Sequence, residues 1–107
     1  MADEQYIVNE LIPDFLRIIS KEYPIDRVIL YGSYAKGYAT KMSDIDIAVI
    51  LNSDNKKDRY IITNRLYKIA QKIDVRIEPR CFFIDEINNA ESASIISEII
   101  KTGHVIN

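Results

Sequence analysis

The 107-residue sequence contains few of the residues that define several common protein classes. It has one cysteine and one histidine, which excludes an internal disulfide and any Cys-rich metal site. Its apolar runs are a handful of residues long, since Asp46 interrupts the stretch 45–51, whereas a membrane-spanning helix needs about 20. No signal peptide is expected, because the chain begins Met-Ala-Asp-Glu-Gln, without a basic or apolar leader segment. We therefore expect a cytoplasmic protein without a membrane segment.

An excess of positive charge is also missing. Fourteen Lys and Arg stand against sixteen Asp and Glu, for a net charge of −2, which argues against broad nucleic-acid binding because phosphate contacts need a basic surface. The apolar fraction of 48% and charged fraction of 28% are those of an ordinary globular protein and exclude disorder. No repeat or linker-like segment interrupts the chain, so we expect a single domain over residues 1–107.

The spacing of apolar residues predicts an α/β fold with a small mixed sheet of three or four strands flanked by helices. Helices are expected over 3–22, 56–72 and 92–102, and strands over 27–31, 44–51 and 74–78, with a short edge strand at 104–106. Pro13 should bend or split the first helix. Gly103 should end the last helix as its C′ residue, and Pro79 follows the third strand. The strand–helix–strand order predicts a right-handed crossover that lays the third strand parallel to the second.

Two aspartates, Asp44 and Asp46, stand at the start of the predicted strand 44–51. Because side chains alternate faces along a strand at about 3.3 Å per residue, both carboxylates point the same way, with Cα atoms roughly 6 to 7 Å apart. The opposite face is a continuous apolar row whose burial fixes the register. Two such carboxylates favour a divalent cation between them, and carboxylates with water and substrate phosphates form the usual Mg²⁺ site. The alternative is that Asp44 caps the strand and Asp46 is merely exposed.

The loop that precedes these aspartates has the composition of a phosphate-binding turn. Gly32 ends the predicted strand 27–31 and allows a ligand to approach the backbone closely, and Ser33 opens a short helix whose N–H groups and dipole attract phosphate. Ser33 adds a hydroxyl and Lys36 a positive charge, with a solvated surface lysine as the equal alternative. Since the loop joins two strands, we expect those strands to be antiparallel neighbours, with the loop and the acidic pair at one rim.

The stretch from Gly32 to Asp46, in which Gly-Ser is followed by ten residues and Asp-x-Asp, resembles the signature of the DNA-polymerase-beta-like nucleotidyltransferases. The sequences Gly-Ser-x-Ala-x-Gly and Ser-Asp-Ile-Asp-Ile-Ala-Val are similar to those of the minimal nucleotidyltransferases, or MNT proteins, short single-domain chains of about this size. The resemblance implies a nucleoside triphosphate such as ATP, bound with Mg²⁺ at Gly32, Ser33, Lys36 and Gly37. It also implies transfer of a nucleotide to a hydroxyl group.

Members of this superfamily usually complete the metal site with a third acidic residue on a neighbouring strand. Here the candidates are Asp74 and Glu78. If the third strand begins at Asp74 and runs parallel to the second, Asp74 lies level with Asp44 and Asp46, whereas Glu78 is about 13 Å further along. We therefore expect Asp74 to be the third metal ligand and to accept or orient the proton of the attacking hydroxyl. A turn residue is the alternative for Asp74, and a surface ion pair for Glu78.

Four other residues have a structural role or an uncertain place in nucleotide binding. Cys81, beside two phenylalanines, is expected to be a small buried hydrophobe, and His104 a surface or edge residue rather than a general base. Tyr34 either stacks on a nucleotide base or is an exposed loop aromatic. Lys36 stands where the family often has arginine, and since lysine cannot make a planar bidentate phosphate contact, weaker nucleotide affinity is expected.

Three functions remain open from the sequence. By resemblance, the leading one is an adenylyltransferase that acts as the antitoxin of a HEPN-family toxin, because some MNT proteins silence the HEPN ribonuclease by adenylylating a tyrosine. The second is a catalytically idle antitoxin that works by binding its toxin; the intact Asp44 and Asp46 argue against it. The third is a nucleotidyltransferase for small molecules whose pocket is completed by a homo- or hetero-oligomer.

Overall fold

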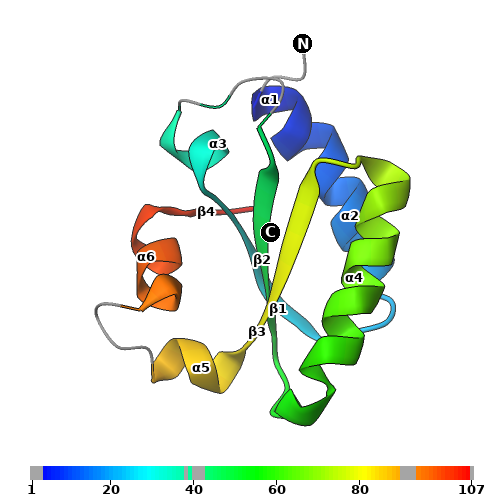
Figure 1. Cartoon of the computed structure of the whole chain (residues 1–107), viewed down its shortest axis with the longest axis vertical. Helices are drawn as coiled ribbons and strands as arrows, with labels where there is room; N and C mark the ends of the chain where they lie inside the picture. The colour runs from blue at the N-terminus through cyan, green and yellow to red at the C-terminus, as the bar shows by residue number, and fades with distance from the viewer. Residues whose placement is uncertain (1–3, 38, 40–42, 90–93, 107) are drawn as a thin grey trace.

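The structure is a computed structural model and describes residues 4–37, 39, 43–89 and 94–106. Its strands form one mixed sheet in the order β3-β2-β1-β4 (Figure 1). They are β1 (Ile25–Tyr31), β2 (Ile45–Leu51), β3 (Ile77–Phe83) and β4 (His104–Val105). β1 is antiparallel to both β2 and β4, whereas β2 and β3 are parallel. The expected α/β fold with a mixed sheet flanked by helices is confirmed.

Helices connect the strands and cover both faces of the sheet. They are α1 (Glu4–Tyr6), the π-helical η1 (Ile7–Leu11), α2 (Ile12–Ile19), α3 (Ser33–Lys36), the 3₁₀ turn η2 (Lys56–Asp58), α4 (Arg59–Ile73), α5 (Ile84–Asn88) and α6 (Ile95–Thr102). Across the described ranges, none of these helices is both long and apolar enough to pass through a bilayer.

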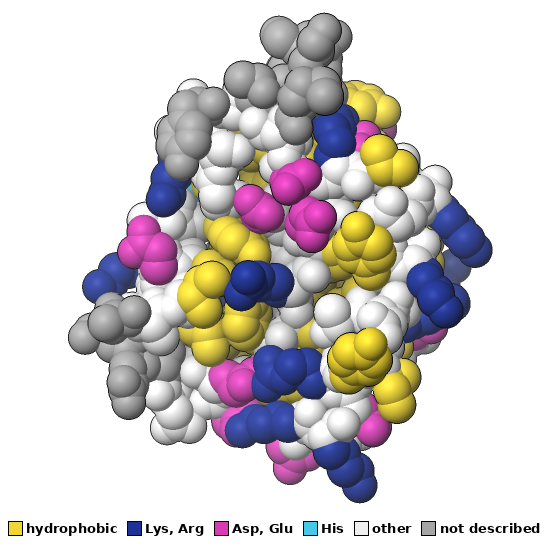
Figure 2. All heavy atoms as spheres, viewed as in Figure 1, with side chains coloured by type: hydrophobic (Ala, Val, Ile, Leu, Met, Phe, Trp, Pro, Cys, Tyr) yellow, Lys and Arg dark blue, Asp and Glu magenta, His cyan; other side chains and the backbone are white. Residues whose placement is uncertain are grey.

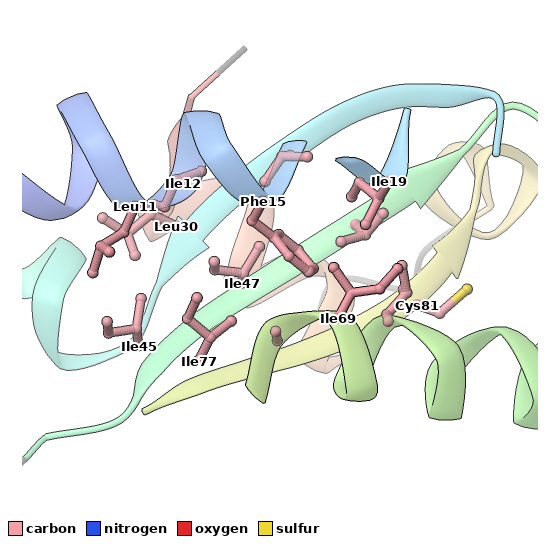
Figure 3. Packing of buried hydrophobic residues seen from close by; sticks show 14 of the residues in the cluster. Leu11, Ile12, Phe15, Ile19, Leu30, Ile45, Ile47, Ile69, Ile77 and Cys81 are labelled. Carbon is pink, nitrogen blue, oxygen red and sulfur yellow. The ribbon is translucent and has the colours of Figure 1, made fainter. Parts of the chain in front are cut away.

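The main core lies between one face of the sheet and the helices α2 and α4 (Figures 1 and 3). Phe15 of α2, Leu66 of α4 and Ile47 of β2 are fully buried there. The other face carries a smaller cluster under α5 and α6, made by Ile29, Ala48, Ile50, Phe82 and Ile99. The strands β1, β2 and β3 contribute alternate residues to the two clusters, as the two-residue period of a strand requires.

The third strand and the segment that follows it differ from the prediction. β3 begins at Ile77 rather than Asp74, and Pro79 lies inside it. This proline is tolerated because β3 is a terminal strand of the sheet: the Arg76 carbonyl faces β2, where it accepts the Ile45 N–H at 2.7 Å, so by alternation Pro79 directs its missing N–H to the free edge. The helix α5 was not predicted from the sequence, and the predicted helix start at residues 92 and 93 lies outside the described residues.

Pro13 changes the hydrogen bonding of the first helix without ending it. Since proline has no N–H to donate, the turn before it widens, and the Ile12 N–H bonds to the Ile7 carbonyl in the π-helical pattern. The expected split does not occur: the helical run continues from η1 into α2 through Pro13, with one π-helical turn before it.

Gly103 ends α6, but not in the left-handed conformation of a glycine C′ residue. Its φ of −81° and ψ of 164° are open to any residue. The need for glycine is steric instead, because a Cβ here would overlap Ile29 Cγ2 and lie 2.5 Å from the Ile99 carbonyl oxygen.

We expect Gly103→Ala to lower the free energy of unfolding by about 2 kcal/mol, within the range for overpacking. Gly37→Ala is the matched control, since Gly37 has a φ of +84° but open space around its Cα, so that only about 1 kcal/mol of backbone strain is expected. Urea unfolding followed by circular dichroism measures both. Equal losses in the two variants would contradict the steric explanation.

Candidate active site

Three carboxylates meet at one end of the sheet, on the face opposite the main core. Asp46 lies directly opposite Glu78 of β3 and Tyr31 of β1, and Asp44 immediately precedes β2. The three carboxylates and Tyr31 line a pocket of about 310 Å³ together with Arg80 and Ile95. Figure 2 shows acidic side chains gathered on this face of the molecule.

The charges in this pocket repel one another. Burial, followed by the negative charges of Asp44 and Glu78, raises the pKa of the Asp46 carboxyl above its ordinary value, and the guanidinium of Arg80 opposes this effect. A half-buried carboxylate between two others is costly to ionise unless a cation approaches it. The pocket therefore favours binding of a positive ion.

The glycine that ends β1 is pressed against Asp46. Gly32 has a φ of +75° and a ψ of −150°, and a Cβ at this position would overlap Asp46 Oδ2. Only glycine satisfies both the conformation and the close approach. The first turn of α3, beginning at Ser33, therefore starts next to the carboxylates, as the sequence analysis expected for the loop and the acidic pair.

Lys36 and Gly37 lie at the far end of α3. The Lys36 ammonium is 3.9 Å from Glu98 of α6 and partly exposed, and Gly37 takes the left-handed conformation that ends the helix. Neither residue lines the carboxylate pocket. Gly32, in contrast, lies directly against the Asp46 carboxylate.

Asp74 is not level with Asp44 and Asp46, so that expectation is wrong. It follows α4 directly, three residues before β3 begins, and its carboxylate accepts hydrogen bonds from the Arg76 backbone N–H (2.9 Å), Nε (3.0 Å) and Nη2 (2.7 Å). These hydrogen bonds hold the pKa of Asp74 below its ordinary value. The position opposite Asp46 belongs to Glu78.

Tyr34 is also placed differently from either alternative. It is buried, with 4% of its surface exposed, and its hydroxyl accepts a hydrogen bond from Arg76 Nη1 at 3.3 Å. Tyr34 thus joins α3 to the turn before β3 through the ion pair of Arg76 and Asp74. Cys81 is buried as expected, and burial raises the pKa of its thiol to about 11.

The pocket also contains Tyr31, Arg80 and Ile95, which were not predicted from the sequence. Two of them could have been identified from the sequence. Tyr31 immediately precedes Gly32 of the glycine loop, and Arg80 follows Glu78 by two residues on the same strand. Ile95 carries no such signal, since α6 reaches the pocket only through the tertiary fold.

The carboxylates of this pocket fit a magnesium ion that takes only some of its ligands from the protein. Over the described part of the chain, no group of three or more His, Cys, Asp or Glu side chains is already arranged to hold a metal ion. Mg²⁺ is commonly bound by one or two carboxylates together with waters and substrate phosphates, rather than by an all-protein cage. Asp44, Asp46 and Glu78 match this mode, in which a substrate completes the site.

The contrast between Asp74 and Glu78 predicts different effects on stability when each carboxylate is replaced by an amide. Asp74→Asn should lower the free energy of unfolding by about 1 to 2 kcal/mol at pH 7, because it weakens the charged hydrogen bonds to Arg76, whereas Glu78→Gln should leave stability unchanged or raise it by removing repulsion with Asp46.

The measurement is urea unfolding in the presence of a metal chelator. Since the folded-state pKa of Asp74 is lowered, its stabilising effect is present above its unfolded-state pKa of about 3.9 and is lost as the pH falls through the folded-state value. A deficit of Asp74→Asn that persists below that range would contradict the ion-pair explanation.

Comparison with known proteins shows which proteins this chain resembles. A family model described as nucleotidyltransferase domain matches residues 12–105. Of two similar proteins of Methanocaldococcus jannaschii, "Putative protein adenylyltransferase MJ0141" is 32% identical over 92 residues, covering 77% of this chain and 93% of that protein. "Putative protein adenylyltransferase MJ1305" is 30% identical over 95 residues, covering 79% of this chain and 65% of that protein.

A solved structure shares the fold. The crystal structure described as a "putative nucleotidyltransferase from Sulfolobus solfataricus" superposes with a TM-score of 0.66 at 16% identity, covering 95% of this chain and 81% of that one. At this identity the likeness concerns the fold alone. Because the family model matches residues 12–105, which is most of the chain, the chain belongs to the nucleotidyltransferase domain family and is a nucleotidyltransferase.

Proposed function

We propose that this chain is a Mg²⁺-dependent adenylyltransferase that moves AMP from ATP to a hydroxyl group of a partner protein. The observation that carries the proposal is the pocket in which Asp44, Asp46 and Glu78 face one another beside Gly32. Carboxylates next to a glycine-led helix start suit a triphosphate that brings its own cation.

In the proposed reaction, each residue of the pocket has a separate task. Asp44 and Asp46 would hold Mg²⁺, which when bound neutralises phosphate charge. The backbone at Gly32 and the hydroxyl of Ser33 would receive the phosphates. The acceptor oxygen bonds to the α-phosphorus, the bond from that phosphorus to the bridging oxygen breaks, and pyrophosphate leaves. Glu78 is the carboxylate we assign to orient the acceptor hydroxyl and take its proton.

The identity of the acceptor is proposed from relatives. The two Methanocaldococcus proteins carry names that specify protein adenylyltransferase activity, which supports a protein hydroxyl over a small molecule. The resemblance to MNT proteins supports a HEPN-family toxin as the partner, with this chain as its antitoxin. Use of ATP would also agree with the cytoplasmic location expected from the sequence.

We expect Asp46→Asn and Glu78→Gln each to reduce AMP transfer by about 100-fold or more, as is typical when a group that stabilises or deprotonates in the transition state is removed. Asp74→Asn is the matched control, because it removes a carboxylate near the same strand but outside the pocket; it should retain transfer per folded molecule. The assay follows radiolabelled AMP from ATP, with circular dichroism to verify folding. Retained transfer in Glu78→Gln together with its loss in Asp74→Asn would return the third-carboxylate role to Asp74.

The acceptor is tested by intact-mass spectrometry of the chain purified with and without the protein encoded by the neighbouring gene, after incubation with Mg²⁺ and ATP. We expect one or more AMP units on the neighbouring protein, and none with Asp44→Asn, because Asp44 is one of the proposed Mg²⁺ ligands. A stable complex without a mass change would instead support an antitoxin that acts by binding.

A further inference from the structure

The helix α3 depends on contacts outside itself for its position. It consists of the four residues Ser33–Lys36, and a single turn is not stable alone because helix nucleation is unfavourable. Its backbone is closed by hydrogen bonds from the Lys36 N–H to the Gly32 carbonyl at 3.1 Å and from the Gly37 N–H to the Ser33 carbonyl. The place of its first turn, where the phosphates are proposed to bind, is therefore set by tertiary contacts.

Two of these contacts lie on opposite faces of the sheet. Tyr34 is 4% exposed, and its ring belongs to the main core together with Ile45 and Ile77. Gly32, two residues earlier, lies against the Asp46 carboxylate on the pocket face. The start of α3 thus straddles the end of the sheet at which β2 and β3 begin (Figure 1).

A third contact gives α3 a direction that apolar packing alone does not supply. The Tyr34 hydroxyl accepts a hydrogen bond from Arg76 Nη1 at 3.3 Å. Burial of a ring is favourable in many orientations because the hydrophobic effect is non-directional, whereas a hydrogen bond requires a defined donor–acceptor geometry. The bond to Arg76 therefore selects one orientation of Tyr34, and with it one orientation of α3.

The backbone of Arg76 is tied to the start of β2. Its carbonyl accepts the Ile45 N–H at 2.7 Å, and Ile45 stands between Asp44 and Asp46 in the sequence. Arg76 also precedes Glu78 by two residues. A single residue thus connects α3 with the strands that carry all three carboxylates.

The side chain of Arg76 is fixed as well. It is 20% exposed, and its Nε and Nη2 bond to the two carboxylate oxygens of Asp74 at 3.0 and 2.7 Å. Because the guanidinium is planar and presents its donors in a rigid fork, these bonds direct Nη1 toward Tyr34. Asp74 thereby positions Arg76 while remaining outside the carboxylate pocket.

We infer that Tyr34 and Arg76 are positioning residues of the nucleotidyltransferase reaction, and that their hydrogen bond holds α3 ready to receive the triphosphate beside Asp44 and Asp46. Neither residue lines the carboxylate pocket, so the effect is transmitted through α3. The inference rests on the proposed function and adds to it a determinant of nucleotide affinity behind the site. It also replaces base stacking as the role of Tyr34, because the ring is buried.

The test removes the hydrogen bond and keeps the ring. Tyr34→Phe, Arg76→Gln and the double variant are compared by isothermal titration calorimetry for binding of α,β-methylene ATP with Mg²⁺, an analogue that cannot release pyrophosphate. We expect each single variant to bind about tenfold more weakly, as when the competent state of α3 is populated about one tenth of the time. The double variant should lose no more than the weaker single variant, since both changes remove the same bond. AMP transfer at saturating ATP should be retained.

Asp74→Asn is the matched control, with circular dichroism to verify that every variant is folded. An asparagine keeps Oδ1, which accepts the Arg76 backbone N–H and Nε, so this variant loses stability but leaves Arg76 in place. We expect it to bind the analogue like the unmodified chain. Equal weakening in Asp74→Asn and Tyr34→Phe would mean that affinity follows stability, and would overturn the positioning role. If Arg76→Gln does not fold, Tyr34→Phe and this control decide the question.

A second measurement needs no nucleotide. Amide hydrogen exchange by NMR at Lys36 and Gly37, whose N–H groups close the turn of α3, should be about tenfold faster in Tyr34→Phe. The Ile45 amide, bonded to the Arg76 carbonyl, should keep its rate and serves as the internal control.

Unchanged exchange or unchanged analogue binding in Tyr34→Phe overturns the inference, as do losses of affinity that add in the double variant. Failure of the proposed function is a separate result, namely no binding of the analogue by the unmodified chain. In that case the exchange rates still decide whether the bond between Tyr34 and Arg76 holds α3.

Discussion

The parallel register between β2 and β3 is the constraint on which the site depends. It sets Glu78 opposite Asp46, and Ile77 opposite Ile45. Both isoleucines are fully buried, so a slip of one residue would turn Glu78 into the core and Ile77 into the pocket. The hydrophobic contacts of one face therefore determine which carboxylates meet on the other.

The antiparallel contact between β1 and β2 adds a second constraint. Tyr31 is the register partner of Asp46, so the next residue, Gly32, passes against the Asp46 carboxylate with no room for a side chain. The same contact sets the start of α3 beside the acidic group. The fold thus holds like charges together, at an electrostatic cost that the covered face of the sheet offsets and that a bound cation would relieve.

Much of this arrangement was predictable from the sequence. The alternation of β2 identified the face of Asp44 and Asp46, and Gly32 identified the turn beside them. The identity of the third carboxylate was not predictable, because Asp74 and Glu78 are both acidic residues in an alternating segment. The choice between them depended on the residue at which the strand begins. A predicted strand start at Asp74 placed that residue level with Asp44 and Asp46, whereas the observed register sets Glu78 opposite Asp46. Only the pairing of β2 with β3 distinguishes the two candidates.

The segment from Asp74 to Arg80 explains why pattern alone was insufficient. It contains two acid–arginine pairs with the same spacing, Asp74 with Arg76 and Glu78 with Arg80. The first lies in a turn, where the chain curves back and the two side chains close on each other at 2.7 Å. The second lies on a regular strand, where side chains two residues apart stand side by side, and no ion pair joins them among the described residues.

The two pairs therefore have different consequences from the same sequence pattern. The carboxylate of Asp74 is occupied by hydrogen bonds from Arg76, which lower its pKa. Arg76 in turn donates a hydrogen bond to the Tyr34 hydroxyl. The carboxylate of Glu78 stays open to the pocket. Arg80 instead opposes the rise in the pKa of Asp46 and lines a second pocket beside α4. Backbone conformation, more than residue identity, decides which acidic group remains available for chemistry and which becomes part of the scaffold.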